Sequence, residues 1–152
     1  MSEREQWQEL AARYERAFGQ DLKGICLFGS RARGTARTDS DHDILLVAAG
    51  LSADVFTRAR QIRDPLRGLD TASVQVLART PDDFLKDVTP LHLDLALDAR
   101  VLFERDGFLS QHLERLRELI NEAGLYRTPE LFWRWRNPPR RDWAITWQGV
   151  RV

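Results

Sequence analysis

Two short apolar runs, separated by a polar segment, constrain the fold of this chain more than any other feature of its sequence. Residues 25–28 and 43–48 are each too short for a buried helix and are typical of buried strands. Between them, residues 29–40 are rich in Gly, Ser, Thr and Arg, which predicts a turn or a short helix followed by a loop. The chain is therefore expected to join two strands through a polar connection.

Helical periodicity predicts a layer that covers these strands. Residues 2–18 form an amphipathic pattern that begins with a capping box of Ser2 and Glu5. Ser52 is expected to cap a second helix. The apolar positions of that second helix are Val55, Phe56, Ala59 and Ile62.

The second half of the chain predicts another strand and further helices. Residues 72–78 are expected to form a third strand, whose side chains alternate between its two faces. Asp106 is expected to cap a long helix that ends at Gly124. The inward positions of this helix are Leu109, Leu113, Leu116 and Ile120. The order of elements predicts an α/β (α+β) fold, a sheet covered by helices.

Composition excludes several classes of protein. The chain has 152 residues, of which 43% are apolar and 30% charged, as in a soluble globular domain. No apolar run reaches the roughly 18–20 residues of a membrane helix, and the first residues lack a signal-peptide pattern. Cys26 is the only cysteine, which excludes an intrachain disulfide. We expect a cytoplasmic protein.

The polar segment carries a pattern that suits a phosphate group. Gly29 lets the backbone approach an anion closely, and Ser30 adds a hydroxyl. A helix that starts here would direct N–H groups at the same anion. Arg31 and Arg33 add positive charge. These four residues therefore predict a phosphate-binding turn.

Two aspartates follow the turn. Asp41 and Asp43 are two residues apart at the start of the second strand, so both side chains point to one face. His42 then points to the opposite face and has no metal role. Mg²⁺ takes a few carboxylates and completes its coordination shell with phosphates and water. The pair therefore predicts a Mg²⁺ site beside the turn.

Gly29-Ser30, ten further residues and then Asp41-His42-Asp43 resemble the signature of the DNA polymerase β-like nucleotidyltransferase superfamily. The segment Gly-Ser-Arg-Ala-Arg-Gly most resembles the minimal nucleotidyltransferases of prokaryotes. The resemblance covers residues 22–104 within an expected nucleotidyltransferase domain of residues 1–124. It implies that the sheet is a palm-like mixed sheet covered by helices.

The resemblance implies transfer of a nucleoside monophosphate from an NTP, with ATP expected, to a hydroxyl acceptor. Asp41 and Asp43 would be the catalytic residues and hold two Mg²⁺ ions, and Gly29, Ser30, Arg31 and Arg33 would bind the nucleotide. Minimal nucleotidyltransferases often act as antitoxins that adenylylate a tyrosine of a HEPN-domain toxin. The resemblance thus implies a partner protein as acceptor.

One position departs from the family pattern. Active members place a third carboxylate on the next strand, where this chain is expected to have Gln75, a neutral side chain that is no base. Asp70, Asp94 and Asp98 are the candidate replacements. The alternative function is a catalytically degenerate module that neutralises a partner by contact.

Residues 125–152 form a C-terminal extension outside the resemblance. They carry a net charge of +4, against −4 for residues 1–124, and four of the five tryptophans. Aromatic and arginine side chains are typical anchors of protein interfaces and also of sites for single-stranded nucleic acid. We favour packing onto the domain, or onto a second copy as a homo-oligomer, over nucleic-acid binding.

Overall fold

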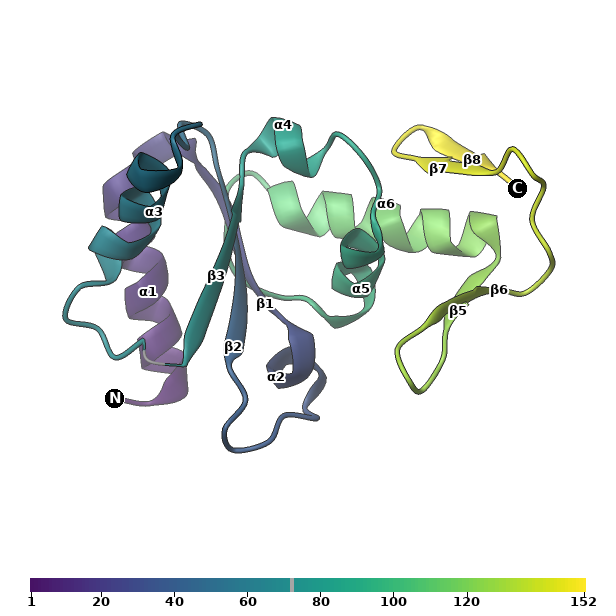
Figure 1. Cartoon of the computed structure of the whole chain (residues 1–152). Helices are drawn as coiled ribbons and strands as arrows, with labels where there is room; N and C mark the ends of the chain where they lie inside the picture. The colour runs from purple at the N-terminus through teal and green to yellow at the C-terminus, as the bar shows by residue number, and fades with distance from the viewer. Residues whose placement is uncertain (72) are drawn as a thin grey trace.

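A four-stranded mixed sheet runs through the centre of the molecule in the order β3-β2-β1-β4 (Figure 1). The computed structural model describes residues 1–71 and 73–152. β1 pairs antiparallel with β2 and with β4, whereas β2 and β3 run parallel. The strands are β1 (Leu22–Phe28), β2 (His42–Ala48), β3 (Val74–Arg79) and β4 (Arg100–Glu104).

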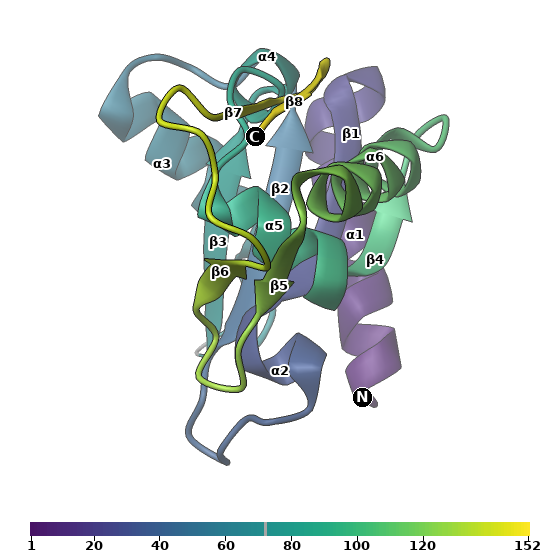
Figure 2. The ribbon, with the colours of Figure 1, turned by 90° about the vertical axis from the view of Figure 1, so that its right-hand side faces the viewer.

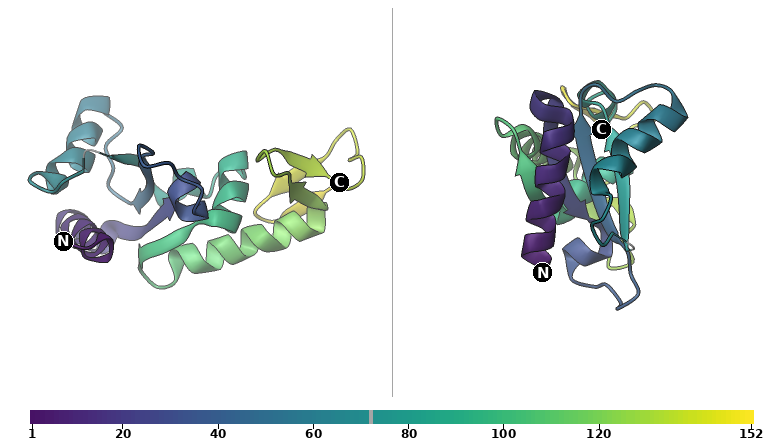
Figure 3. Two further views of the ribbon diagram at one scale, coloured as in Figure 1. Left: turned by 90° about the horizontal axis from the view of Figure 1, so that it is seen from below. Right: turned by 90° about the vertical axis from the view of Figure 1, so that its left-hand side faces the viewer.

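Helices cover both faces of this sheet, and a short helix lies at one end of its central strands (Figures 1 and 3). On one face lie α1 (Glu3–Phe18) and α3 (Val55–Arg63), each followed by a 3-10 turn, η1 (Gly19–Asp21) and η2 (Asp64–Leu66). The opposite face carries α4 (Pro81–Phe84), α5 (Pro90–Asp98) and α6 (Phe108–Ala123). The short helix α2 (Gly29–Arg33) follows β1 directly. The predicted fold class is confirmed.

Alternation along the two central strands divides the core into two clusters. Ile25 and Ile44 are buried with α1, whereas Cys26 and Leu45 are buried with α5 and α6. Burial raises the pKa of the Cys26 thiol to about 12, so this residue serves as a small apolar side chain. The sheet is buried on both faces, which explains why its central strands are apolar runs.

Two predicted helix caps are wrong. Asp54, and not Ser52, accepts the hydrogen bond from the backbone N–H of Thr57 and caps α3. Because α3 begins at residue 55, Val55 and Phe56 lie in its first turn and are 75% and 77% exposed, instead of buried.

The second correction concerns α6. Its cap is Gly107, and both Asp106 and Gly107 have positive φ, because the chain must turn sharply between β4 and α6. The capping box of Ser2 and Glu5 is confirmed. The predicted start of the third strand, Ala72, lies outside the described residues, and the described strand begins at Val74.

The C-terminal extension packs onto α5 and α6. It forms two hairpins, β5 (Leu125–Arg127) with β6 (Trp133–Trp135) and β7 (Ala144–Thr146) with β8 (Gly149–Arg151). Trp147 lies in an aromatic cluster with Phe84, His92 and His112. The extension therefore completes the core on the α5–α6 side of the sheet. Among the described residues, no helix is long and apolar enough to cross a membrane.

Candidate active site

The antiparallel pairing of β1 and β2 brings the predicted phosphate-binding turn against the predicted metal ligands. Phe28, the last residue of β1, pairs with Asp43 near the start of β2. Gly29 follows with a φ of 73°, and a Cβ atom at this position would collide with a carboxylate oxygen of Asp43. Only glycine fits here, since it combines the positive φ with the close approach.

The two aspartates lie close enough to repel each other. Burial and the charge of Asp41 together raise the pKa of the half-buried Asp43, and the charges of Arg33 and His42 offset part of this effect. Asp41 is exposed in the loop that precedes β2. A pair of carboxylates with this mutual repulsion favours a bound cation.

His42 lies on the opposite face of β2, as predicted. Its ring contacts Trp7 of α1 at a centroid distance of 5.0 Å, and its Nδ1 atom lies 3.3 Å from the hydroxyl of Ser73. The Mg²⁺ site proposed below therefore does not include this imidazole.

Arg31 has a contact that its position in the sequence does not reveal. Its Nε and Nη2 atoms donate to the carbonyl oxygen of Ser40, and Nη2 also donates to that of Thr38, at 2.9–3.2 Å. These bonds close the loop between α2 and β2 and thereby shape the approach to Asp41. A phosphate contact of Arg31 stays a prediction.

Arg33 lies between the aspartates and α5. Its Nη1 atom is 3.2 Å from a carboxylate oxygen of Asp98, and its charge lowers the pKa of Asp43. Ser30 lies one position after Gly29, in the first turn of α2, where backbone N–H groups have no acceptor within the helix. The turn thus offers a hydroxyl, N–H groups and one guanidinium on the side of Asp43.

The position that faces the aspartates on the neighbouring strand is Gln75, as predicted. β2 and β3 are paired in parallel with Asp43 directly opposite Gln75, which is exposed. Within the described part of the chain, no three His, Cys, Asp or Glu side chains are grouped as a metal site. Gln75 can offer only a neutral carbonyl oxygen to a cation in this place.

The three candidate replacements for a carboxylate at position 75 have other contacts. Asp98 is bound by Arg33 and Arg127, and Asp94 by Arg127 and the indole N–H of Trp133. The backbone carbonyl of Asp70 accepts a hydrogen bond from Gln6 of α1. Sequence reasoning missed the pairing of Asp98 with two arginines, although Asp94 and Asp98 are four residues apart on one helix face.

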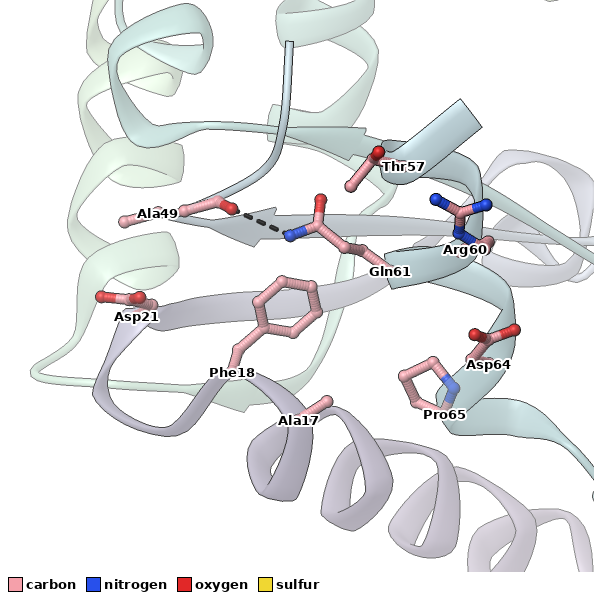
Figure 4. A pocket seen from close by; sticks show the side chains of 10 residues that line it. Ala17, Phe18, Asp21, Ala49, Thr57, Arg60, Gln61, Asp64 and Pro65 are labelled. Atoms are coloured by element: carbon pink, nitrogen blue, oxygen red, sulfur yellow. Dashed lines mark hydrogen bonds between the residues drawn. The ribbon is translucent and has the colours of Figure 1, made fainter. Parts of the chain in front are cut away.

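A surface pocket of about 450 Å³ lies away from this site (Figure 4). Its lining includes Asp21, which precedes β1, and Gly50, which follows β2, so it lies at the other end of these strands from Gly29. The Gln61 side chain extends across it and donates to the carbonyl oxygen of Gly50 at 3.0 Å. The pocket is therefore separate from the candidate site.

The fold and the site define a nucleotidyltransferase domain. The profile of the nucleotidyltransferase domain family matches residues 4–119, and the chain belongs to this family. The predicted resemblance is thereby confirmed.

Particular relatives can be named beside the family. A candidate protein adenylyltransferase of Methanocaldococcus jannaschii is 33% identical over 118 residues. The match covers 74% of this chain and 79% of the relative. A crystal structure of a candidate nucleotidyltransferase of Sulfolobus solfataricus is 25% identical with a TM-score of 0.50 and covers 68% of this chain and 81% of its own.

A toxin–antitoxin structure with AMP-PNP shares the fold as well. It has a TM-score of 0.51 at 20% sequence identity and covers 75% of this chain and 86% of its own.

Proposed function

We propose that this protein transfers a nucleoside monophosphate from an NTP, in the presence of Mg²⁺, to a hydroxyl group of a partner protein. The observation that carries the proposal is the close approach of the Gly29 turn to Asp43. A phosphate held at the turn would lie beside two carboxylates, which is the arrangement that phosphoryl chemistry with divalent metals requires.

Each residue of the site has a role in this proposal. Gly29 and Ser30 would hold the phosphates, and Arg33 would neutralise part of their charge. Asp41 and Asp43 would hold Mg²⁺, because a bound cation would relieve the repulsion between the two carboxylates. Bound Mg²⁺ stabilises negative charge on the attacking and leaving oxygens. The acceptor hydroxyl would lose its proton to water and its oxygen would bond to the α-phosphorus. The bond from the α-phosphorus to the β-phosphate oxygen would break, and pyrophosphate would leave.

Two observations support a protein acceptor. The similarity to a candidate protein adenylyltransferase supports a protein hydroxyl as the acceptor and ATP as the nucleotide. Asp41 and Gln75 are exposed, so the site opens onto a surface that a second protein can reach. A HEPN-domain toxin is the proposed partner, and the fold shared with a toxin–antitoxin structure is consistent with it.

Labelled nucleotides test the proposal. The protein is incubated with Mg²⁺, each of the four NTPs labelled at the α-phosphate, and the product of the adjacent gene. We expect label from ATP on the partner and no transfer by an Asp41→Asn, Asp43→Asn double variant. Asp39→Asn is the matched control, because Asp39 is an exposed aspartate of the same loop. Equal transfer by the double variant would refute the assigned site.

A second candidate function is a binding module without turnover. Gln75 opposite Asp43 favours it, because a neutral amide cannot take the proton of the acceptor hydroxyl. Calorimetric titration with ATP, with and without Mg²⁺, distinguishes the two functions when it is combined with the transfer assay. Binding without transfer to any partner protein would favour the module.

A further inference from the structure

A chain of hydrogen bonds and ion pairs connects the C-terminal extension to the candidate active site. It starts at Trp133 of β6 and continues through Asp94 of α5, Arg127 of β5 and Asp98 of α5 to Arg33 of α2. Figure 2 shows that the β5–β6 hairpin lies beside α5 and that its connecting loop extends toward the level of α2. The connected residues are far apart in the sequence, so the fold alone brings them together.

Asp98 is the centre of this network. Its side chain is only 6% exposed, and its two oxygens accept hydrogen bonds of 2.7 Å from the two terminal nitrogens of Arg127. One of these oxygens also lies 3.2 Å from Nη1 of Arg33. Burial alone would raise the pKa of Asp98, but the hydrogen bonds of both arginines outweigh it and hold the pKa below its usual value.

Arg127 is held in a fixed orientation. Its side chain is 12% exposed, and Nη1 also lies 3.2 Å from Asp94, whose carboxylate accepts a 2.9 Å hydrogen bond from the indole of Trp133. The guanidinium lies 6.0 Å from the centre of the Trp133 ring. A planar bidentate pair of this kind is specific in geometry and has no equivalent with lysine.

The charges in this network have a consequence for Arg33. Without Arg127, Asp98 would have Arg33 as its only cationic partner in the network, and the ion pair would compete with any phosphate for that guanidinium. Arg127 is bound to Asp98 through two hydrogen bonds, so Arg33 is not the sole counter-charge of this carboxylate. Arg33, whose side chain is 21% exposed, then keeps its positive charge available on the side of Asp43.

We infer that Arg127 is a positioning residue, which binds Asp98 and thereby leaves the charge of Arg33 free for the triphosphate of the nucleotide. This inference rests on the proposed function, since it assigns Arg33 to the phosphates. It gives the C-terminal extension a part in nucleotide affinity, although no residue of the extension touches the nucleotide.

Steady-state kinetics with Mg·ATP test the inference. Arg127→Gln is expected to raise KM about tenfold, equivalent to about 1.4 kcal/mol, and to change kcat less than about twofold. The added substitution Asp98→Asn removes the competing carboxylate and is expected to restore KM to within about threefold of the wild type. Arg134→Gln is the matched control, because Arg134 is an exposed arginine of the same hairpin.

The double variant separates positioning from simple support of the structure. If Arg127 only stabilises the fold, Asp98→Asn adds to the damage, KM does not recover, and the inference is overturned. Arg127→Lys keeps the charge without the bidentate geometry, and we expect a KM between those of the wild type and Arg127→Gln. Circular dichroism establishes that each variant is folded.

A measurement without nucleotide keeps this inference apart from the proposed function. The ¹⁵Nε–H signal of Arg33, assigned by its loss in Arg33→Lys, is expected to shift in Arg127→Gln and to stay in place in Arg134→Gln. An unchanged signal in Arg127→Gln overturns the inference. A wild-type protein that binds no NTP refutes the proposed function, and a shifted signal would then still support the coupling of Arg127 to Arg33.

Discussion

At the scale of single residues, the candidate site depends on one contact, between Gly29 and the carboxylate of Asp43. The contact joins the turn that follows β1 to the first residues of β2. Any side chain at position 29 would push the two apart, and a phosphate held at the turn would then lie farther from Asp43.

Gly29→Ala should therefore abolish transfer and destabilise the protein by more than the strain of a positive φ, which is about 1 kcal/mol. Gly34→Ala supplies the control, because Gly34 has a φ of 78° but open space where a Cβ would lie. Urea unfolding and the transfer assay measure both variants. Equal stabilities of the two variants would contradict the collision with Asp43.

Asp43 lowers stability in the absence of a cation, because its folded pKa is raised by burial and by Asp41. Asp43→Asn is expected to stabilise the metal-free protein by a few tenths to about 1 kcal/mol while abolishing transfer. For a raised carboxylate pKa, the destabilisation that Asp43 causes relative to Asp43→Asn disappears as the pH falls through the folded pKa. The wild type and the variant should therefore converge toward pH 3 in urea unfolding.

Added Mg²⁺ supplies the control for this prediction. It should stabilise the wild type and leave Asp43→Asn nearly unchanged, because ligand binding to the folded state adds to its stability. If Asp43→Asn is less stable than the wild type in a chelating buffer at pH 7, the inferred repulsion between Asp41 and Asp43 is contradicted.

The spacing of Gly29, Ser30, Asp41 and Asp43 was sufficient to predict which residues of the turn and the strand come together. Strand alternation and one tight connection determine these positions locally. The partner of Arg33 was not predictable in this way, since Asp98 lies 65 residues later and packing of α5 against the sheet decides the pairing. The true contacts of Arg31 with loop carbonyls likewise depend on the loop conformation.

At the scale of elements, α4 and α5 are joined by a buried imidazole. His92 accepts a hydrogen bond from the backbone N–H of Thr89 at 3.1 Å through Nδ1, and its Nε2 lies 2.7 Å from the carbonyl oxygen of Phe84. The neutral tautomer with the proton on Nε2 satisfies both bonds, and Nδ1 also lies 2.7 Å from the hydroxyl of Thr89.

Stability should consequently fall as the pH decreases from 7.5 to 5. Burial, the largest cause, lowers the pKa of His92, so the stability present above pH 6.5 is lost as the pH falls through the folded pKa. Urea unfolding of His92→Gln is expected to show a smaller loss over this range, although the variant is less stable at pH 7.5. A loss of stability in His92→Gln as steep as that of the wild type over this range would contradict the prediction.

Most element types were predictable from periodicity and caps, but two helix starts were not. Asp54 and Gly107 begin their helices because the chain reverses direction immediately before them, and residue preferences at a cap do not reveal where a reversal falls. The wrong start of α3 also explains why Val55 and Phe56 were expected to be buried but are exposed, since a shift of a few residues rotates the apolar face of a helix.

At the scale of the whole molecule, the extension after α6 is part of the hydrophobic core. Leu125 is buried, and the rings of Trp133, Trp135 and Trp147 pack against the cluster of α5 and α6. Packing of the tryptophans onto the domain was one of two predicted arrangements, the other being packing onto a second copy of the chain. Assembly with a second copy through the extension stays a prediction.

Trp147→Ala should destabilise the protein by about 2–3 kcal/mol, because it removes the ring that joins Phe84, His92 and His112. Trp143 is 49% exposed, and Trp143→Ala should cost less than about 1 kcal/mol. Urea unfolding followed by circular dichroism measures both. A similar loss for the two variants would mean that the extension does not stabilise the core through Trp147.

The order of elements was enough to predict a sheet covered by helices, and the family resemblance implied that this sheet is mixed. The path of the extension across α5 and α6 was beyond sequence reasoning, because three-residue strands carry almost no periodic signal and their positions depend on tertiary packing.

The binding of one carboxylate by arginines from two separate elements also has a consequence for evolution. A substitution at position 98, 127 or 33 alters the charge balance of the other two, so in related chains these three positions should change together. A lineage that lost the β5–β6 hairpin would be under selection to replace the acidic residue at position 98. The acidic residue and the hairpin should then be inherited or lost as one unit.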